Sequence, residues 1–316
     1  MRTTVLPDGL EVGSIGLGCM SMSHAYTPLE RDDAESARVL NRAADLGVTL
    51  FDTADVYGPR TNEELIGRAL RARRDEVVLA TKCGLVSGPG GVLSRNGRPE
   101  YVRAACEASL ARLDTDRVDL LQLHRVDPAV PLEETWGAMA KLVTDGKALR
   151  LGISHASVEE LDRAHAVHPV AAVQYELSIW ADYTLHDVLP WCRAHGVAFL
   201  AFSPIGRGYL SGRLAATAFG ADDSRSRDPR FTVEAMAANA DIARAVRAVA
   251  DRRGATPAQV AIAWVLAQGP EVIPIPGTKK MRWLEENAAA AEVELDAEDL
   301  RELAAVPAPV GHRRWS

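Results

Sequence analysis

Short apolar segments alternate with amphipathic segments along the chain, and the alternation is unusually regular. The apolar segments are six or seven residues long and almost continuously hydrophobic, which is typical of parallel strands covered by helices. The sequence therefore predicts eight strands, within residues 14–19, 48–54, 77–83, 118–124, 149–154, 171–177, 197–203 and 271–277.

Helical patterns fill the intervals between these strands. In the first interval Ala37, Leu40 and Ala44 recur at helical spacing, and Gly47 supplies a stop at the C-terminal end. In another interval Ser157 is followed three residues later by Glu160, the spacing of a capping box. We expect helices within residues 31–47, 98–114, 131–146, 157–168, 233–254 and 256–269.

Eight strands that alternate with helices predict an α/β fold of the (β/α)8 or TIM-barrel type, and 316 residues suit one large barrel. An Asp-Gly turn lies between two short β-like runs in residues 3–13, so we expect an N-terminal hairpin outside the barrel. The pattern in 233–254 predicts extra helical structure near the C-terminal end. An open doubly wound sheet is the alternative, but no G-x-G-x-x-G follows the first strand. With no linker or repeat in view, we expect residues 1–316 to form one domain.

The composition, 47% hydrophobic and 25% charged, is that of an ordinary globular protein. A net charge of -7 argues against a surface for nucleic acid or for an anionic membrane. The four cysteines show no C-x-x-C pair or zinc spacing, and no apolar run approaches the roughly 18 residues of a membrane span. We therefore expect a cytoplasmic protein with reduced thiols and no bound metal, either monomeric or a weak homo-oligomer.

Polar residues stand at the carboxyl ends of the predicted strands, the edge where barrel enzymes carry their active sites. Asp52, Tyr57, Lys82 and His124 form a chemically coherent set. The usual pKa of tyrosine, near 10, is high for proton transfer at neutral pH, and a neighbouring ammonium lowers it. A carboxylate holds that ammonium in place, and a histidine can donate a hydrogen bond to a carbonyl oxygen. The set predicts a site that protonates a carbonyl oxygen as a hydride reaches the carbonyl carbon.

Each of these residues, taken alone, also has a structural explanation, such as a solvated lysine or a histidine that caps a strand. Three other functions remain open at this point. Lys82 can form a Schiff base in an aldolase, although this leaves Tyr57 and His124 unexplained. Asp52, His124 and His155 can bind a catalytic metal, although no local ligand cluster supports one. The third is a regulatory subunit that binds a cofactor with little turnover.

Motifs along almost the whole chain resemble those of the aldo-keto reductase superfamily. In order they are LFDTADVYG, ATKCG, LLQLHRVDP, LGISHAS, AAVQYEL, FSPIGRGYLSG and VIPIPGTKKMRWLEENAAA. The LHRVDP and IPGT motifs are most similar to the bacterial and plant oxidoreductase branch. The resemblance implies NADPH-dependent reduction of an aldehyde or ketone, with Asp52, Tyr57, Lys82 and His124 as the catalytic tetrad.

The resemblance also implies that NADPH lies across the mouth of the barrel. Ser154 and Gln174 would hold the nicotinamide carboxamide, with His155 beside them where the family more often has Asn, and Phe202 would stack on the ring. The other implied contacts are Ser203, Ile205, Gly206, Arg207 and Gly208 at the pyrophosphate, and Gly277, Thr278, Lys279, Lys280, Arg282, Glu286 and Asn287 at the adenosine phosphate.

Physical chemistry supports two of these placements independently. Glycines beside Arg207 allow a phosphate to approach the backbone closely, and a guanidinium suits forked contact with phosphate. Lys279, Lys280 and Arg282 precede a predicted helix whose N-terminus favours anions, so a 2′-phosphate and hence NADPH over NADH is expected. The alternative for this cluster is a solvated basic start of a helix. Trp283 stands where some relatives carry an arginine beside the adenine.

Substrate specificity is expected from the loops above the barrel mouth, residues 20–26, 85–98, 177–183 and 213–231, and from the C-terminal tail. Arg125 is either a pocket residue or one half of a structural ion pair. The substrate-contacting residues that we predict are Met20, Tyr26, Tyr57, His124 and Trp180.

Overall fold

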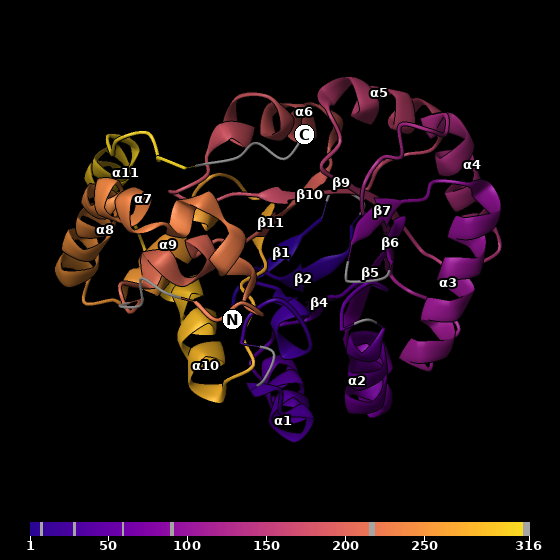
Figure 1. Ribbon diagram of the computed structural model, residues 1–316, viewed down its shortest axis with the longest axis horizontal. Helices are drawn as coiled ribbons and strands as arrows, with labels where there is room; N and C mark the ends of the chain where they lie inside the picture. Colours follow the sequence, from indigo (N-terminus) through magenta and orange to yellow (C-terminus); the bar gives the residue numbers. More distant parts are fainter. Residues whose placement is uncertain (7–8, 28–29, 59, 89–91, 215–218, 312–316) are drawn as a thin grey trace.

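Eight parallel strands form one curled sheet, in the order β12-β11-β10-β9-β8-β5-β4-β3, with helices around its outer face (Figure 1). The computed structural model describes residues 1–6, 9–27, 30–58, 60–88, 92–214 and 219–311. Each strand lies within one of the eight predicted segments, so the predicted (β/α)8 fold is confirmed. The strands are β3 (Leu17–Gly18), β4 (Leu50–Asp52), β5 (Val78–Cys83), β8 (Leu120–Leu123), β9 (Leu151–Ser154), β10 (Ala172–Glu176), β11 (Ala198–Phe202) and β12 (Val272–Pro274).

The first and last strands meet and close the barrel. Gly18 and Gly277 form a parallel bridge, and the Gly18 amide donates to the Pro276 carbonyl at 3.3 Å. The two backbones approach closely because Gly18 has no side chain. A Cβ at this position would lie 2.8 Å from the carbonyl oxygen of Ile275. The seam thus depends on a glycine, and it brings the carboxyl ends of β3 and β12 side by side.

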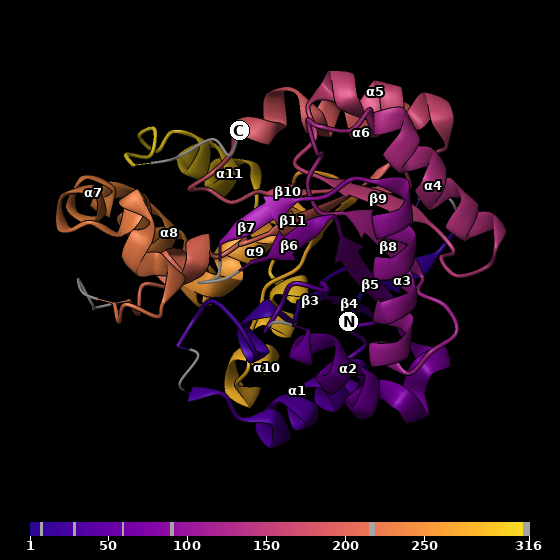
Figure 2. The same cartoon turned by 45° about the vertical axis from the view of Figure 1, so that its right-hand side comes forward.

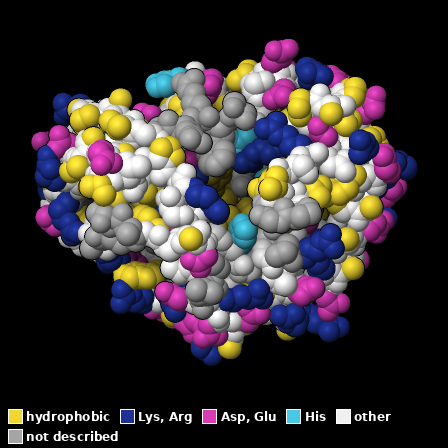
Figure 3. Space-filling model, in the orientation of Figure 1, with side chains coloured by type: hydrophobic (Ala, Val, Ile, Leu, Met, Phe, Trp, Pro, Cys, Tyr) yellow, Lys and Arg dark blue, Asp and Glu magenta, His cyan; other side chains and the backbone are white. Residues whose placement is uncertain are grey.

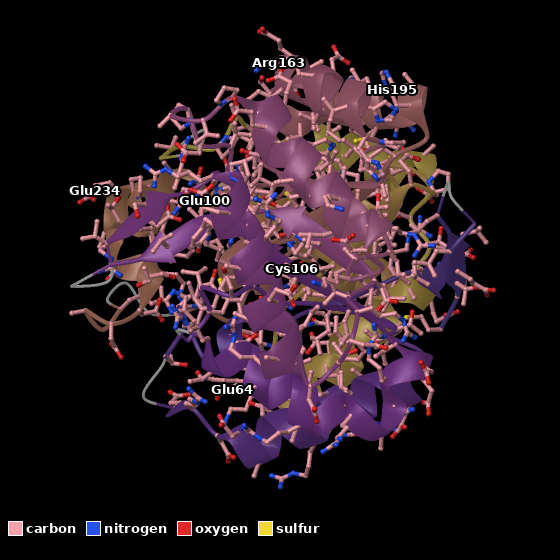
Figure 4. All side chains as sticks on the ribbon, turned by 90° about the vertical axis from the view of Figure 1, so that its right-hand side faces the viewer. Glu64, Glu100, Cys106, Arg163, His195 and Glu234 are labelled. Carbon is pink, nitrogen blue, oxygen red and sulfur yellow. The ribbon has the colours of Figure 1, made fainter. Side chains whose placement is uncertain are left out.

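The helices form an outer layer that follows the strands in sequence order (Figure 2). In Figure 4, Glu64 marks α2, Cys106 marks α3 and Arg163 marks α5 within this layer. In the part of the chain that the structure describes, no helix combines the length and apolarity needed to cross a membrane. The barrel helices are α1 (Asp33–Asp45), α2 (Thr61–Leu70), α3 (Pro99–Leu113), α4 (Leu132–Thr144), α5 (Val158–Val167), α6 (Val188–His195), α9 (Pro257–Leu266) and α10 (Met281–Ala289).

Local signals of the sequence explain several of these boundaries. The predicted capping box is present, because the Ser157 hydroxyl accepts from the Glu160 amide and the Glu160 carboxylate accepts from the Ser157 amide. The single helix expected over 233–254 was wrong in one respect, since it is divided into α7 (Val233–Ala238) and α8 (Ala240–Arg253). The buried Asn239 side chain lies at the division and exchanges two hydrogen bonds, of 2.8 and 3.0 Å, with the backbone of Val310.

Within the described residues, three α-helices lie outside the eightfold repeat, in agreement with the extra helical structure expected near the C-terminal end. They are α7, α8 and α11 (Ala297–Ala304). A short hairpin of β6 (Leu85–Ser87) and β7 (Leu93–Arg95) also rises from the loop after β5, and the sequence pattern did not predict it. Residues 89–91 and 215–218 of the predicted specificity loops, and 312–316 of the C-terminal tail, lie outside the described residues.

The N-terminal hairpin is confirmed, with β1 (Thr3–Val5) antiparallel to β2 (Glu11–Gly13); Asp8 of the predicted turn lies outside the described residues. Leu6, Leu10 and Val12 pack against the first residues of the barrel strands. These strand residues include Leu50, Val78, Leu120, Ala172 and Ala198. Because the hairpin covers the amino end of the barrel interior, the carboxyl end is the one left for chemistry.

We expect Gly18→Ala to destabilise the protein by about 1–3 kcal/mol, because the added methyl group meets a backbone oxygen at the seam. Urea unfolding followed by far-UV circular dichroism measures the change. Gly137→Ala is the matched control, since a Cβ at this position of α4 meets nothing within 4 Å. The control should be neutral or stabilised by up to about 1 kcal/mol. Equal unfolding midpoints for Gly18→Ala and the wild type would contradict this view of the seam.

Candidate active site

Charged and amide side chains fill the barrel interior at its carboxyl end. Asp52 is the last residue of β4 and pairs in register with Ala80 of β5, so Lys82, two residues further on, faces the same side. Lys82 is in turn opposite Gln122 of β8, and Gln174 lies on β10. All four polar side chains are buried. Strand register therefore brings together groups that are up to 122 residues apart in the sequence.

Lys82 and Asp52 form a buried ion pair. The Lys82 side chain is fully buried, and its Nζ donates to Asp52 Oδ2 at 2.6 Å and to the Thr53 carbonyl at 2.8 Å. Burial by itself lowers the pKa of Lys82, but attraction to Asp52 and Tyr57 outweighs it and leaves the pKa above its usual value. Lys82 is therefore an ammonium at neutral pH.

The second carboxylate oxygen of Asp52 accepts two amide hydrogen bonds. Gln174 Nε2 donates to Asp52 Oδ1 at 2.7 Å, and Gln122 Nε2 donates to the same oxygen at 3.0 Å. These bonds satisfy the buried carboxylate from the side opposite Lys82. The sequence resemblance assigned Gln174 to the nicotinamide carboxamide, and in this structure its amide nitrogen is bonded to Asp52.

Tyr57 lies in the loop after β4 with its hydroxyl 3.5 Å from Lys82 Nζ. The ammonium also stands 5.2 Å from the centre of the Tyr57 ring. Desolvation raises the pKa of Tyr57, whereas Lys82 lowers it, and the net direction is upward. The sequence argument expected Lys82 to bring the pKa below 10. Lys82 does lower the pKa of Tyr57 in the structure, but burial raises this pKa by more.

His124 follows β8 and is buried beside Tyr57. The two rings meet edge to face with their centres 5.9 Å apart. Burial, followed by the charges of Lys82 and Arg125, lowers the pKa of His124 well below 6.5. The imidazole is therefore neutral at physiological pH and can donate one N–H hydrogen bond. No partner for its Nδ1 is present among the described residues.

A cavity of about 1190 Å³ opens above these residues, and Figure 3 shows a hollow at the centre of this face. It extends from Asp52, Tyr57 and His124 to the start of α10. The other predicted site residues that line it are Met20, Tyr26, Ser154, Gln174, Phe202, Ser203, Ile205, Arg207, Gly208, Gly277, Thr278, Lys279, Lys280, Glu286 and Asn287.

Several polar residues at the far end of the cavity already have protein partners. Lys279 Nζ donates to the Thr27 carbonyl at 2.8 Å and to the Tyr26 carbonyl at 3.3 Å, so it ties down the loop after β3. Arg207 Nη1 lies 2.9 Å from an oxygen of Asp228. Lys280, by contrast, is exposed and lines the cavity.

Glu286 is held by Arg213, which donates to its carboxylate at 2.8 and 3.0 Å, and by the Thr256 hydroxyl at 2.6 Å. The adenosine end of the predicted cofactor site is thus partly organised by contacts within the protein. Among the described cations predicted to contact the cofactor, Lys280 is both exposed and on the cavity surface.

Trp180 lies away from the cavity, contrary to its predicted substrate role. Its side chain is fully buried, stacks on Tyr209 with the ring centres 4.2 Å apart and meets Phe231 edge to face. Gly206 has a φ of +56°, and a Cβ there would lie 2.9 Å from the Trp180 ring. Trp180 and Gly206 therefore shape the core beneath the loop after β11 rather than the cavity surface.

Three more predicted residues are not on the cavity surface. Lys82 lies beneath it, paired with Asp52 and 3.5 Å from the Tyr57 hydroxyl. His155, at a φ of +55°, packs against Tyr175 and Phe202 with ring-centre distances of 4.9 and 5.4 Å. The Arg282 guanidinium lies 3.6 Å over the Trp283 ring.

Sequence reasoning missed two residues of the site. Gln122 stands in the middle of an apolar strand, and this polar interruption of LLQL was an available signal. His24 stacks on Tyr57 with ring centres 6.3 Å apart and lines the cavity. His24 belongs to a loop without a periodic pattern, so nothing in the sequence distinguished it from its neighbours.

Comparison with known proteins identifies the family. The model of the family described as "Aldo/keto reductase family" matches residues 14–307. The chain belongs to the aldo/keto reductase family. It is therefore an oxidoreductase, as the sequence resemblance predicted. A probable aldo-keto reductase from Glycine max is 43% identical to this reductase over 297 residues, or 93% of this chain and 85% of the relative.

Solved structures agree with this assignment. The reductase is 31% identical to the glycerol dehydrogenase of Gluconobacter oxydans, with a TM-score of 0.86 over 96% of this chain and 94% of that one. It is 30% identical to an aldo-keto reductase from Klebsiella pneumoniae solved in complex with NADPH. That comparison has a TM-score of 0.75 and covers 98% of this chain and 97% of that one.

Within the described ranges of the reductase, no three His, Cys, Asp or Glu side chains form a group that can hold a metal ion. This includes Asp52, His124 and His155, the ligands that a metal-dependent hydrolase would have used.

Asp55, in the same loop as Tyr57, is buried beside a second acid, Glu63. Glu63 is paired with Arg112 at 2.7 Å and accepts from the Thr81 hydroxyl at 2.6 Å. Asp55 Oδ1 has no partner among the described residues. Burial, and next the charge of Glu63, raise the pKa of Asp55 from 3.8 to about 7.

This raised pKa predicts a pH-dependent stability. Between about pH 4 and pH 7 the folded chain keeps a proton on Asp55 that the unfolded chain releases, so stability falls as the pH rises through this window. Asp55→Asn removes this loss. We expect the variant to be more stable than the wild type at pH 8, by up to about 4 kcal/mol, and the difference to disappear toward pH 4. Urea midpoints measured at pH 4.5, 6 and 8 test this, and a difference that does not change with pH would refute it.

Proposed function

We propose that this reductase uses NADPH to reduce an aldehyde or ketone to the alcohol, as a carbonyl reductase of the alcohol dehydrogenase type. The observation that carries the proposal is the position of the Lys82 ammonium. It lies 2.6 Å from Asp52 Oδ2 and 3.5 Å from the Tyr57 hydroxyl, directly beneath the cavity. This arrangement supports Tyr57 as the proton donor.

The proton is transferred by residues at the cavity floor. Tyr57 donates its hydroxyl proton to the carbonyl oxygen of the substrate, and Lys82 stabilises the phenolate that remains. Asp52 keeps Lys82 charged and in position. The neutral imidazole of His124 donates a hydrogen bond to the same carbonyl oxygen and orients it beside Tyr57. When bound, NADPH supplies the hydride to the carbonyl carbon.

The residues of the cavity fit a dinucleotide. Gly208 lines the cavity with a φ of +97° and has no side chain, which favours close approach of a phosphate to its backbone. Phe202 and Ser154 line the catalytic end, and Lys280 precedes the N-terminus of α10 at the other end. The NADPH complex of the Klebsiella relative supports the same cofactor for this chain. His155 and Arg282 are not among the residues that line the cavity.

The geometry disfavours the aldolase alternative. A Schiff base needs a neutral amine that the substrate can reach. Lys82 is fully buried, ion-paired with Asp52 and has a raised pKa, so it is a poor nucleophile.

Tyr57→Phe should reduce turnover by about 10²- to 10⁴-fold, because it removes the proton donor. NADPH oxidation at 340 nm, with a panel of aromatic aldehydes, pyridoxal and cyclic ketones, measures the loss. NADPH affinity should stay close to that of the wild type. Undiminished turnover in Tyr57→Phe would rule out this donor, and a wild type that does not bind NADPH would rule out the proposed NADPH-dependent reduction.

Lys280→Met should raise the KM for NADPH about tenfold, or roughly 1.4 kcal/mol, with little change for NADH, if Lys280 binds the 2′-phosphate. The neighbouring Lys279→Met is the matched control. Because Lys279 holds the loop at Thr27, its loss should affect NADPH and NADH alike. Steady-state kinetics with both cofactors decide between these patterns, and equal effects of Lys280→Met on the two cofactors would contradict the assignment.

A further inference from the structure

Arg125 places a guanidinium in the cavity next to the catalytic residues. It directly follows His124 in the chain and lines the same cavity. Its Nη1 donates to the His124 carbonyl at 2.6 Å and lies 3.3 Å from the Ser154 hydroxyl. These two contacts hold the side chain between β8 and β9, but neither of them neutralises its charge.

Three other arginines on the cavity surface, the half-buried Arg207 and Arg225 and the exposed Arg213, are neutralised by carboxylates of the protein. Their partners are Asp228 for Arg207, Glu286 for Arg213 and Asp223 for Arg225, at 2.9, 2.8 and 2.7 Å. Arg125 has no carboxylate within ion-pair distance in the described parts of the chain, so the structural ion pair considered from the sequence is not found there. Arg227 also has none, but it is exposed to water at the rim.

An uncompensated guanidinium at this position is costly for the protein. Arg125 is half-buried, and desolvation is the leading reason that its pKa is lowered to about 10. The opposing influences that raise the pKa are tyrosine hydroxyls, with Tyr57 the largest, rather than an acid. An anion bound in the cavity would supply the missing partner, and a guanidinium binds a carboxylate through two parallel hydrogen bonds.

The surroundings indicate what kind of molecule carries that anion. Met20, Val56, Leu85 and Leu93 give this end of the cavity an apolar wall. A ligand here has one end at Tyr57 and His124 and an apolar body along this wall. Its charged group would lie at Arg125.

We propose that Arg125 binds a carboxylate on the substrate, so that the preferred substrates are oxo acids, carbonyl compounds with an apolar body and a carboxylate. This inference rests on the proposed reductase function and adds the substrate class. Arg125 acts on substrate binding, whereas Tyr57, Lys82 and His124 act on the proton.

The test compares an acid with its own ester. The probes are 4-formylbenzoate and methyl 4-formylbenzoate, each reduced with NADPH by the wild type and by Arg125→Met. The measured quantity is the ratio of kcat/KM for the acid to kcat/KM for the ester. The different electronic effects of the acid and ester groups are the same for both proteins and cancel in the comparison. The ratio should fall about 10- to 100-fold in Arg125→Met, mainly through the KM for the acid.

Further variants separate the guanidinium from general charge. Arg227→Met removes a cation from the cavity rim and should keep the wild-type ratio. Arg125→Lys keeps the positive charge but cannot form the two parallel hydrogen bonds of a guanidinium. Its acid-to-ester ratio should lie between those of the wild type and Arg125→Met. Arg125→Gln keeps a donor without the charge, so its ratio should fall as in Arg125→Met even if the latter does not fold.

Each other outcome overturns the inference in a distinguishable way. If both aldehydes are reduced and the ratio is the same in the wild type, Arg125→Met and Arg125→Gln, Arg125 does not bind the carboxylate, but the reductase function stands. If the KM for NADPH rises and the ratio does not change, Arg125 serves the cofactor through Ser154 instead. If the wild type oxidises NADPH with neither aldehyde nor with the wider carbonyl panel, the proposed function itself fails.

Discussion

The buried ion pair between Lys82 and Asp52 is the interaction on which the rest of the site depends. Removing two charges from water costs several kcal/mol each, and their attraction repays this only when the remaining hydrogen-bonding capacity is satisfied. Here Lys82 reaches the Thr53 carbonyl and Tyr57, and Asp52 accepts from Gln122 and Gln174. Asp52, Lys82, Gln122 and Gln174 lie on four strands, and these strands must keep their register for the network to stay intact.

The cations at the two ends of the cavity are neutralised in different ways. Around the cofactor end, cations such as Arg207 and Arg213 are matched by acids of the protein, so the binding surface is preorganised before any ligand arrives. At the other end, Asp52 neutralises Lys82, whereas Arg125 has no carboxylate partner among the residues that the structure describes. The ligand that fills this end would then complete the charge balance, which links recognition of the substrate to its position against Tyr57.

The sequence predicted the fold well because the determining signals are local. Eight continuous apolar segments specify strands whatever lies beyond them, and the polar residue at each strand end marks the edge where Asp52, Lys82 and His124 meet. Contacts between residues far apart in the sequence could not be predicted from such local signals. The division between α7 and α8 follows from Asn239 bonding to Val310, 71 residues away. Lys279 is bonded to a loop 252 residues earlier, and Trp180 is taken into the core by Tyr209 and Phe231.

The central claim is that the ammonium held by Asp52 controls the acidity of Tyr57. Its most direct test is the pH dependence of single-turnover carbonyl reduction in the wild type and in Lys82→Met, with NADPH binding used to verify that the variant is folded. In the proposed mechanism protonated Tyr57 is the active form, so the rate should fall at the pH where Tyr57 ionises. Since Lys82 lowers the pKa of Tyr57, the alkaline fall in the single-turnover rate constant should move to higher pH in Lys82→Met. The rate constant on the plateau below this fall should also be smaller than in the wild type. An alkaline limb at the same pH in both proteins would contradict the account.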